Sequence, residues 1–225
     1  QTRCLGKMND VSKSGRTVLF VSHNLQAVTQ LCSRAILLEK GTLALNGDVQ
    51  ECVRRYLANS RSVREASIEY AHFSERKGNG KVKIARIEII DKEAGVVSNQ
   101  LYTDGNLVFR LYVHTELMTR DLNIAFHFYR NDETIFANVG NVDSDFVFEP
   151  FSGQRCFEVS FEKMNLYPDV YKVGISVGTL DWGELYDQII PAFEFVVIEG
   201  AKHIKRQLSP ANGFLYYSPG WKIID

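Results

Sequence analysis

Long apolar runs are missing from this chain of 225 residues. A membrane-spanning helix needs about 18 or more consecutive apolar residues, and no segment approaches that length. The first residues also lack the apolar block of a secretory signal. With 45% hydrophobic and 24% charged residues, the composition is typical of a soluble globular protein with enough material for a core. The length allows one large domain or two modest ones.

Cysteine is scarce and scattered. The four cysteines are Cys4, Cys32, Cys52 and Cys156; they form no C-x-x-C pair and have no histidine at the spacing of a metal site. This pattern favours reduced thiols in the cytosol over disulfides or zinc ligands. The sequence therefore predicts structural, unpaired cysteines and no metal site.

Clustered positive charge is missing from the second part of the chain. The net charge is −1, but residues 1–60 carry 8 lysines and arginines against 4 acidic residues, whereas residues 81–225 carry 14 against 20. Proteins that bind phosphodiester backbones need clustered cations. An acidic, aromatic-rich second part therefore argues against nucleic acid as a partner.

Motifs for catalysis are also missing. There is no G-x-S-x-G nucleophile motif and no cluster of metal ligands. A glycosidase needs two carboxylates facing each other across a sugar, and nothing in the spacing pairs Asp143, Asp145, Glu158 or Glu194. We expect no catalytic residue in this chain as it stands.

The first 58 residues follow an α/β pattern. A helix is predicted over residues 1–14, a buried strand over Thr17–Ser22, a second helix from Leu25 to Cys32, and two short strands around the Lys40-Gly41 turn. A final helix begins after Asp48, a suitable N-cap, and places Val49, Val53, Tyr56 and Leu57 on one face. We expect residues 1–58 to form one unit and the polar residues 59–80, which end in Gly-Asn-Gly, to form a linker.

From Lys81 onward the apolar period changes to two. Seven strand-length segments rich in valine, isoleucine, phenylalanine and tyrosine are separated by turn residues. They are residues 82–90, 106–115, 122–130, 133–139, 155–162, 170–178 and 192–199. Residues 81–225 are therefore predicted to form an antiparallel β-sandwich of jelly-roll or immunoglobulin-like type, so that the whole chain is mainly β.

The segments "GRTVLFVSHN" (15–24) and "CSRAILLEKGTLALNGD" (32–48) resemble the end of an ABC-transporter ATPase domain in order and spacing. In that family a buried strand delivers a histidine to the γ-phosphate of ATP, which implies that His23 is the switch histidine. Ser33 stands where the family usually has aspartate. A histidine at the carboxyl end of a strand suits contact with a nucleotide phosphate, although position alone equally fits a loop cap.

The rest of the ATP site is missing. A phosphate loop needs G-x-x-x-x-G-K-[ST], and neither Gly6-Lys7-Met8 nor Gly80-Lys81-Val82 fits; the signature LSGGQ is also missing. Residues 1–58 are therefore expected to be the last part of an ATPase domain that by itself uses no cofactor. The resemblance implies ATP and magnesium only for the full-length protein.

An ABC ATPase domain followed by a β-sandwich resembles the ATP-binding subunit of a bacterial O-antigen polysaccharide exporter. The resemblance implies that the sandwich binds the modified terminal end of the finished polysaccharide. It also implies a homodimer, a membrane-spanning partner subunit, and a location at the cytoplasmic face of the inner membrane. The aromatic tail "GFLYYSPGWKIID" is too apolar to stay unpacked, and we expect it to pack on its own sandwich or on that of another subunit. The alternative is a sandwich that only dimerises or regulates the ATPase.

The residues themselves suggest a sugar site. If the apolar half of each strand faces the core, the other half brings rings, hydrogen-bonding groups and small residues to a sheet face, as sugar recognition requires. The candidates are Arg110, Tyr112, His114, His127, Tyr129, Lys172 and Ser176. The basic members could meet an anionic cap. Trp182, in a predicted loop, either flanks the site or plugs the sandwich end. The same residues also fit an ordinary solvent-facing sheet surface.

Overall fold

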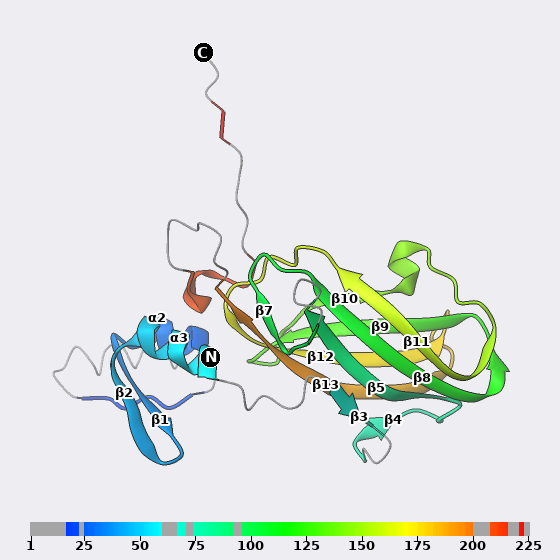
Figure 1. Ribbon diagram of the computed structural model, residues 1–225, viewed down its shortest axis with the longest axis horizontal. Coiled ribbons are helices and arrows are strands. Elements are labelled where there is room, and N and C mark those ends of the chain that lie inside the picture. Colours follow the sequence, from blue (N-terminus) through cyan, green and yellow to red (C-terminus); the bar gives the residue numbers. More distant parts are fainter. Residues whose placement is uncertain are drawn as a thin grey trace.

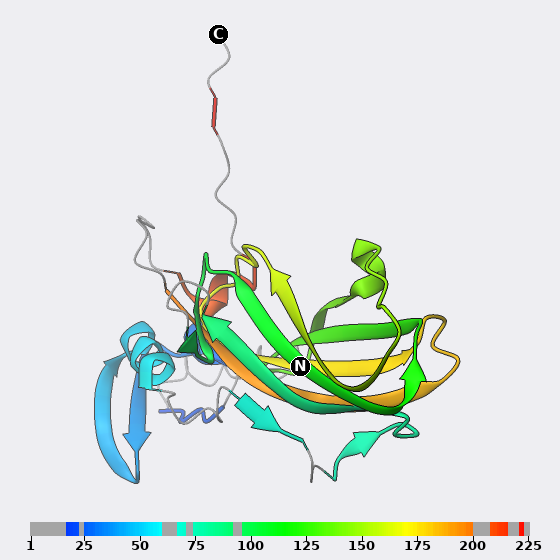
Figure 2. The ribbon, with the colours of Figure 1, turned by 45° about the vertical axis from the view of Figure 1, so that its right-hand side comes forward.

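The computed structural model describes residues 17–22, 25–59, 67–70, 74–91, 96–199, 208–215 and 221–222. A small α/β part lies at one end of the strands of a large β-sandwich, as Figure 1 and the turned view of Figure 2 both show. The predicted helix over residues 1–14 and the predicted switch histidine, His23, lie outside the described residues. The predicted fold class, mainly β with an antiparallel sandwich, is confirmed.

Within the described residues, the α/β part contains two helices and one hairpin. In chain order they are α2 (Leu25–Leu31), β1 (Arg34–Glu39), β2 (Thr42–Asp48) and α3 (Val49–Asn59). Lys40 and Gly41 turn the hairpin with positive φ angles of 49° and 79°, which suit a tight two-residue connection. The Asp48 side chain accepts the backbone N–H groups of Gln50 (2.9 Å) and Glu51 (3.3 Å), which confirms it as the N-cap of α3.

The buried strand predicted over Thr17–Ser22 is wrong. These residues are neither helix nor strand, and Leu19 and Val21 are 84% and 95% exposed. A buried parallel strand needs hydrogen-bonded neighbours on both sides and helices over both faces. None of the strands in the described ranges pairs with this segment, so the sheet that would bury Leu19 and Val21 is not formed among the described residues.

The sandwich consists of two sheets. The β12 sheet has the order β10 (Ile135–Gly140), β9 (Leu122–Arg130), β12 (Asp169–Thr179), β13 (Leu185–Ile198), β4 (Arg76–Lys77), with β7 (Gln100–Tyr102) beside β13. The β8 sheet has the order β11 (Phe151–Phe161), β8 (Leu107–Thr119), β5 (Val82–Asp91), β3 (Ser67–Glu69), with β6 (Val96–Val97) beside β5. All pairings are antiparallel except β7 with β13. Two short 3-10 helices, η1 (Asn141–Ser144) and η2 (Pro210–Asn212), complete the described elements.

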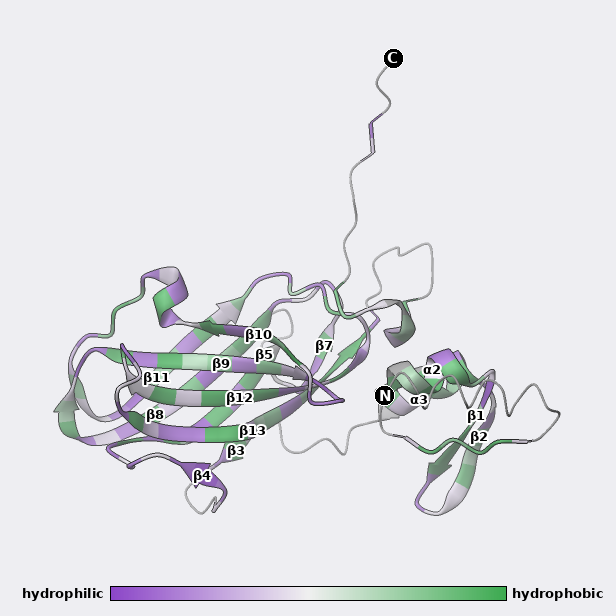
Figure 3. Ribbon diagram, turned by 180° about the vertical axis from the view of Figure 1, so that it is seen from behind, coloured by the Kyte–Doolittle hydropathy of each residue, from purple (hydrophilic) through white to green (hydrophobic). Residues whose placement is uncertain are grey.

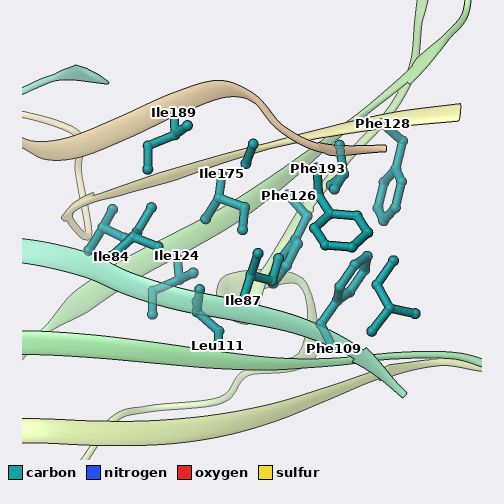
Figure 4. Close-up of a cluster of buried hydrophobic side chains, with 14 of the residues drawn as sticks. Ile84, Ile87, Phe109, Leu111, Ile124, Phe126, Phe128, Ile175, Ile189 and Phe193 are labelled. Atoms are coloured by element: carbon teal, nitrogen blue, oxygen red, sulfur yellow. The ribbon is translucent and has the colours of Figure 1, made fainter. Parts of the chain in front are cut away.

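The core lies between the two sheets. The alternation of apolar and polar residues along the strands is visible in Figure 3, and the apolar half of each strand turns inward. The predicted inward faces of β8, β9 and β12 are confirmed, since all twelve residues expected to face the core are at most 3% exposed: Leu107, Phe109, Leu111, Val113, Leu122, Ile124, Phe126, Phe128, Tyr171, Val173, Ile175 and Val177. The β8 sheet contributes Phe109 and the β12 sheet Phe126, whose rings stack with centroids 5.3 Å apart at the centre of Figure 4.

Part of the predicted linker belongs to the sheets. β3 and β4 both fall within residues 59–80, and they pair with β5 and β13 respectively. Between them, Tyr70 is fully buried and its hydroxyl donates to the carbonyl of Ala192. The side chain of Arg76 pairs with the carboxylate of Asp187 on β13. The chain is therefore attached to both sheets before the first long strand begins.

The α/β part touches the sandwich through apolar side chains. Leu25 of α2 and Val53 and Leu57 of α3 form one buried cluster with Val170 of β12 and Val196 of β13. The Gln30 side chain also donates to the carbonyl of Ala211 in η2 (3.3 Å). The helices therefore rest on the ends of the two central strands of the β12 sheet.

The described residues contain no helix that is both long enough and apolar enough to span a bilayer. Cys32, Cys52 and Cys156 are free thiols, which confirms the unpaired state predicted for these three. Cys4 lies outside the described residues.

Candidate functional site

The predicted site residues are divided between the two outer faces of the sandwich. Arg110, Tyr112 and His114 lie on β8, whereas His127, Tyr129, Lys172 and Ser176 lie on β9 and β12. Because β8 belongs to one sheet and β9 and β12 to the other, their outward side chains point to opposite sides of the molecule. The prediction that all of them share one sheet face is therefore wrong.

On the outer face of the β8 sheet, Tyr112 and Arg110 make polar contacts with neighbouring side chains. The Arg86 guanidinium stacks over the Tyr112 ring, with its carbon 3.8 Å from the ring centroid, and the Tyr112 hydroxyl donates to Glu88 (3.3 Å). Arg110 pairs with Glu158 (3.4 Å) on the neighbouring strand. These side chains mainly satisfy one another, and neither pocket described below includes Arg110, Tyr112 or His114.

A pocket of about 340 Å³ lies on the outer face of the β12 sheet. Its floor is a row of directly paired residues that crosses four strands: Gly140 on β10, Ala125 on β9, Ser176 on β12 and Gln188 on β13. Three of the four have small side chains, which leaves the hollow. His127, Asn138, Asn123 and Trp182 rise around it, with Asp143 of η1 at its border.

A hydrogen-bond chain runs from Gln188 through Ser176 to His127. The Gln188 amide donates to the Ser176 hydroxyl oxygen (2.9 Å), and that oxygen lies 2.8 Å from Nε2 of His127. A serine oxygen can accept a second hydrogen bond or donate its own hydrogen, so this contact suits either protonation state of the ring. Burial lowers the pKa of His127, against a smaller opposing effect of its hydrogen bond with Asn138, and so favours the neutral ring.

Trp182 is held over the pocket by the turn between β12 and β13. Its backbone has a positive φ of 58°, which is unfavourable for a bulky residue. The turn supports it: the Trp182 N–H donates to the Thr179 carbonyl (2.9 Å), and Asp181 accepts the Thr179 hydroxyl (2.7 Å) and the Gly183 N–H (3.0 Å). These two donors lower the pKa of Asp181. The indole remains 41% exposed, and so offers a ring face instead of plugging the core.

Gly178 makes room for the indole. A Cβ placed there would lie 2.9 Å from Cε3 of Trp182 and 2.6 Å from the carbonyl oxygen of Glu184. The Trp182 ring therefore lies directly against the backbone of β12. This close approach fixes the plane of the ring relative to the polar floor of the pocket.

Replacing Gly178 with alanine is expected to lower the free energy of unfolding by about 1–3 kcal/mol, because the added methyl overpacks against backbone. The Trp182 fluorescence should shift as the ring is displaced, and urea denaturation measures the stability change. Gly47→Ala is the matched control, since a Cβ there meets nothing closer than Glu51 Oε2 at 3.9 Å. Equal stability losses in the two variants would contradict the packing of Trp182 on Gly178.

Asn123 carries an unsatisfied acceptor at the pocket. The residue is 3% exposed, and its Nδ2 donates to the Leu180 carbonyl (3.1 Å) in the turn that carries Trp182. Its Oδ1 has no hydrogen-bond partner among the described residues. A buried acceptor without a partner costs about 1–3 kcal/mol. A ligand that donates a hydrogen bond at this point would recover that energy.

Tyr129 and Lys172 share the outer face of the β12 sheet but not the pocket. They are paired across β9 and β12, and Lys172 lies 3.8 Å from Glu133. Ile190 packs over Gly174, between this pair and the Ser176 row. Of the predicted residues, the structure therefore brings together His127, Ser176 and Trp182.

The sequence did not identify Asn138, Asp143 or Gln188 as pocket residues. Gln188 lies in the first half of β13, which the predicted strand over residues 192–199 omitted. Asn138 does alternate outward on β10, but its place beside His127 depends on the pairing of β10 with β9. The feature of the sequence that could have indicated this pocket is the outward alternation of Asn123, Ala125 and His127 along β9.

A second hollow of about 510 Å³ opens between the edge strands β10 and β11. Its walls are mainly the phenylalanine rings of residues 126, 146, 148, 157 and 161. Such a lining suits apolar groups. The hollow on the outer face of the β12 sheet is the one that combines a ring with amide, hydroxyl and imidazole groups.

Comparisons with known proteins agree with this architecture. The model of the Wzt C-terminal domain family matches residues 74–210, which include most of both sheets. A solved structure described as the crystal structure of the C-terminal domain of wzt superposes with a TM-score of 0.56 at 15% identity, and covers 72% of this chain and 93% of that one. At this identity the likeness shows the fold alone.

Shorter matches connect the chain to exporter ATP-binding proteins. A teichoic acids export ATP-binding protein, TagH, of Bacillus anthracis is 33% identical over 86 residues, which are 38% of this chain and 15% of that protein. The O-antigen export system ATP-binding protein RfbB of Klebsiella pneumoniae is 36% identical over 56 residues, which are 25% of this chain and 23% of that protein. The matched parts thus span less than a quarter of either relative.

Proposed function

Because the chain belongs to the Wzt C-terminal domain family, we propose that its β-sandwich binds the terminal end of a polysaccharide exported by an ABC transporter. The supporting observation is the pocket in which an indole face lies beside an amide, hydroxyl and imidazole floor. Sugars present apolar C–H faces that stack on rings and hydroxyls that need directional hydrogen bonds. The unsatisfied Oδ1 of Asn123 offers one such bond.

The proposal extends to the longer protein of which this chain would be a part. Its relatives are ATP-binding subunits of exporters, so we propose that the full-length protein binds ATP and magnesium, with His23 as its switch histidine. It would act with a membrane-spanning subunit at the cytoplasmic face of the inner membrane. Residues 1–58 would form the end of the ATPase domain and residues 81–225 the glycan-binding domain. They would be joined through residues 59–80, of which β3 and β4 pair with strands of the sandwich.

We also propose that the protein acts as a homodimer. Edge strands promote pairing between chains, and β10 and β11 each have one neighbour within the described sheets. A sandwich that only dimerises or regulates the ATPase is the second candidate function. It predicts a stable dimer that binds no polysaccharide, so the same titration separates the two functions.

Replacing Trp182 with alanine is expected to weaken polysaccharide binding more than tenfold, because buried tryptophan contacts commonly contribute at least about 2 kcal/mol. Calorimetric titration of the whole chain, with complete and end-truncated polysaccharide from an organism that carries this exporter, measures the effect. Trp221→Ala is the matched control, since that indole is 92% exposed and outside the pocket. Arg110→Ala, on the other sheet, should also leave the affinity unchanged.

The titration has two outcomes that contradict the proposal. If neither polysaccharide binds while the chain still dimerises, the scaffold function is supported. If both bind and Arg110→Ala, but not Trp182→Ala, removes binding, the glycan site is on the β8 sheet instead.

A further inference from the structure

The charge of the pocket restricts what can enter it. Among the described residues that line it, none is lysine or arginine, and the single formal charge is the carboxylate of Asp143. Recognition of phosphate or carboxylate groups in proteins normally uses arginine, lysine or an array of backbone N–H groups. The cations that the sequence suggests for an anionic cap lie elsewhere: Arg110 is on the other sheet, and Lys172 lies beyond Ile190.

The remaining ionisable group of the pocket adds no positive charge. His127 is partly buried, with Nε2 2.8 Å from the Ser176 hydroxyl oxygen. This burial lowers the pKa of its imidazole, which favours the uncharged form. The imidazole therefore enters recognition as a neutral ring.

Two acceptors in the pocket can take donors from the ligand. Asn123 Oδ1 is buried and unpaired among the described residues. The exposed Asp143 carboxylate accepts the Gly140 N–H through Oδ2 (2.7 Å) and lies among the lining residues of the pocket. A sugar hydroxyl can donate to either group, whereas an ionised phosphate or carboxylate has no hydrogen to donate and is repelled by Asp143.

We infer that the pocket accepts an uncharged terminal sugar that donates a hydrogen bond to Asn123, and that it excludes a phosphorylated or carboxylated terminus. This inference rests on the proposed function and specifies the ligand class of the same site. It assigns the discrimination to Asp143 and Asn123, two residues outside the predicted set of site residues.

Trp182 provides a local reporter for the test. The chain contains two tryptophans, so Trp221→Phe leaves Trp182 as the single indole. This variant is titrated with neutral sugars, the methyl glycosides of glucose, mannose, galactose and rhamnose, while its fluorescence is recorded. In parallel it is titrated with anionic sugars: glucose 6-phosphate, mannose 6-phosphate and glucuronic acid. At least one neutral glycoside should give a saturable change, and every anionic sugar should bind at least tenfold more weakly.

A charge variant tests the assignment to Asp143. Asp143→Asn keeps an oxygen for the Gly140 N–H but removes the negative charge, so the preference for neutral sugars should fall about threefold to tenfold. Asp145→Asn is the matched control, because Asp145 is an exposed neighbour that does not line the pocket. An unchanged preference in Asp143→Asn would overturn this assignment.

The possible outcomes distinguish a failure of this inference from a failure of the proposed glycan-binding function. If anionic sugars change the Trp182 fluorescence with equal or higher affinity than neutral ones, the inference is overturned and glycan binding at the pocket stands. If no sugar of either class changes the fluorescence, the glycan-binding function of this pocket is contradicted together with the inference.

Discussion

Replacing Asp187 with alanine is expected to lower the free energy of unfolding by about 3–5 kcal/mol, the range for a buried ion pair that loses one partner. The Asp187 side chain is 3% exposed, and that of Arg76, its partner, is 21% exposed. Removing the carboxylate would leave a half-buried guanidinium without a counter-charge. Urea denaturation followed by circular dichroism measures the loss.

The size of the effect follows from the number of elements that meet at this pair. Arg76 donates to both carboxylate oxygens of Asp187 and to the carbonyls of Tyr70 and Ile84, each of the latter at 3.0 Å. Asp187 also accepts the Ile84 N–H (2.7 Å). The pair therefore joins β4 and β13 to the start of β5 in the opposite sheet, and its loss would leave buried backbone groups unsatisfied.

Two comparisons make the prediction specific. The double variant Arg76→Met with Asp187→Leu should recover much of the lost stability, because neither charge is then left unpaired. Lys81→Ala should lower the free energy of unfolding much less. The Lys81 ammonium lies 2.7 Å from the Glu184 carboxylate, but both side chains are about half exposed, and exposed ion pairs contribute little to stability. A loss in Asp187→Ala no larger than in Lys81→Ala would show that the pair does not hold the sheets together.

Replacing Asp169 with asparagine is expected to stabilise the protein increasingly as the pH rises. Asp169 begins β12, is 5% exposed, and accepts the Val170 N–H (2.8 Å). Burial raises its pKa from 3.8 to about 7, against smaller opposing effects of this hydrogen bond and of Arg130. Ionisation therefore occurs in a site that disfavours the charge.

The sign of the pH dependence follows from the direction of the shift. The folded state holds the Asp169 proton more tightly than the unfolded state, so stability is fully present below about pH 4 and is lost as the pH rises toward 7. Asparagine resembles the protonated acid and has no such loss. The stability difference between Asp169→Asn and the wild type should grow by about 2–3 kcal/mol between pH 5 and pH 8.

Urea denaturation at the two pH values checks this prediction. Asp121→Asn serves as the control for the same substitution at an exposed site, because Asp121 is exposed and its positive φ of 55° suits asparagine. A constant difference for Asp169→Asn would mean that Asp169 is ionised in the folded protein without cost. Val170, the residue after Asp169, belongs to one buried cluster with Leu25, Val53 and Leu57. The Asp169 carboxyl therefore lies next to the junction with the α/β part.

The sequence by itself determined the strands and their inward faces. The alternation along Leu107–Val113, Leu122–Phe128 and Tyr171–Val177 is a local property, because side chains of a strand alternate whatever its neighbours are. Each predicted inward residue is buried. The N-cap at Asp48 and the turn at Lys40-Gly41 were likewise predicted from neighbouring residues alone.

Only the tertiary structure decided which outward faces lie together. Alternation places Arg110 and His127 outside their strands, but the pairing of β8 with β5 and of β9 with β12 puts them on opposite sides of the sandwich. The same pairings bring Gln188 to Ser176 and Asn138 to His127. They also turn Ser67–Glu69 and Arg76–Lys77, which read as linker, into sheet, and none of the described strands pairs with Thr17–Ser22. Pairing joins residues far apart in the chain through backbone hydrogen bonds that any side chain permits, so the local sequence carries little record of it.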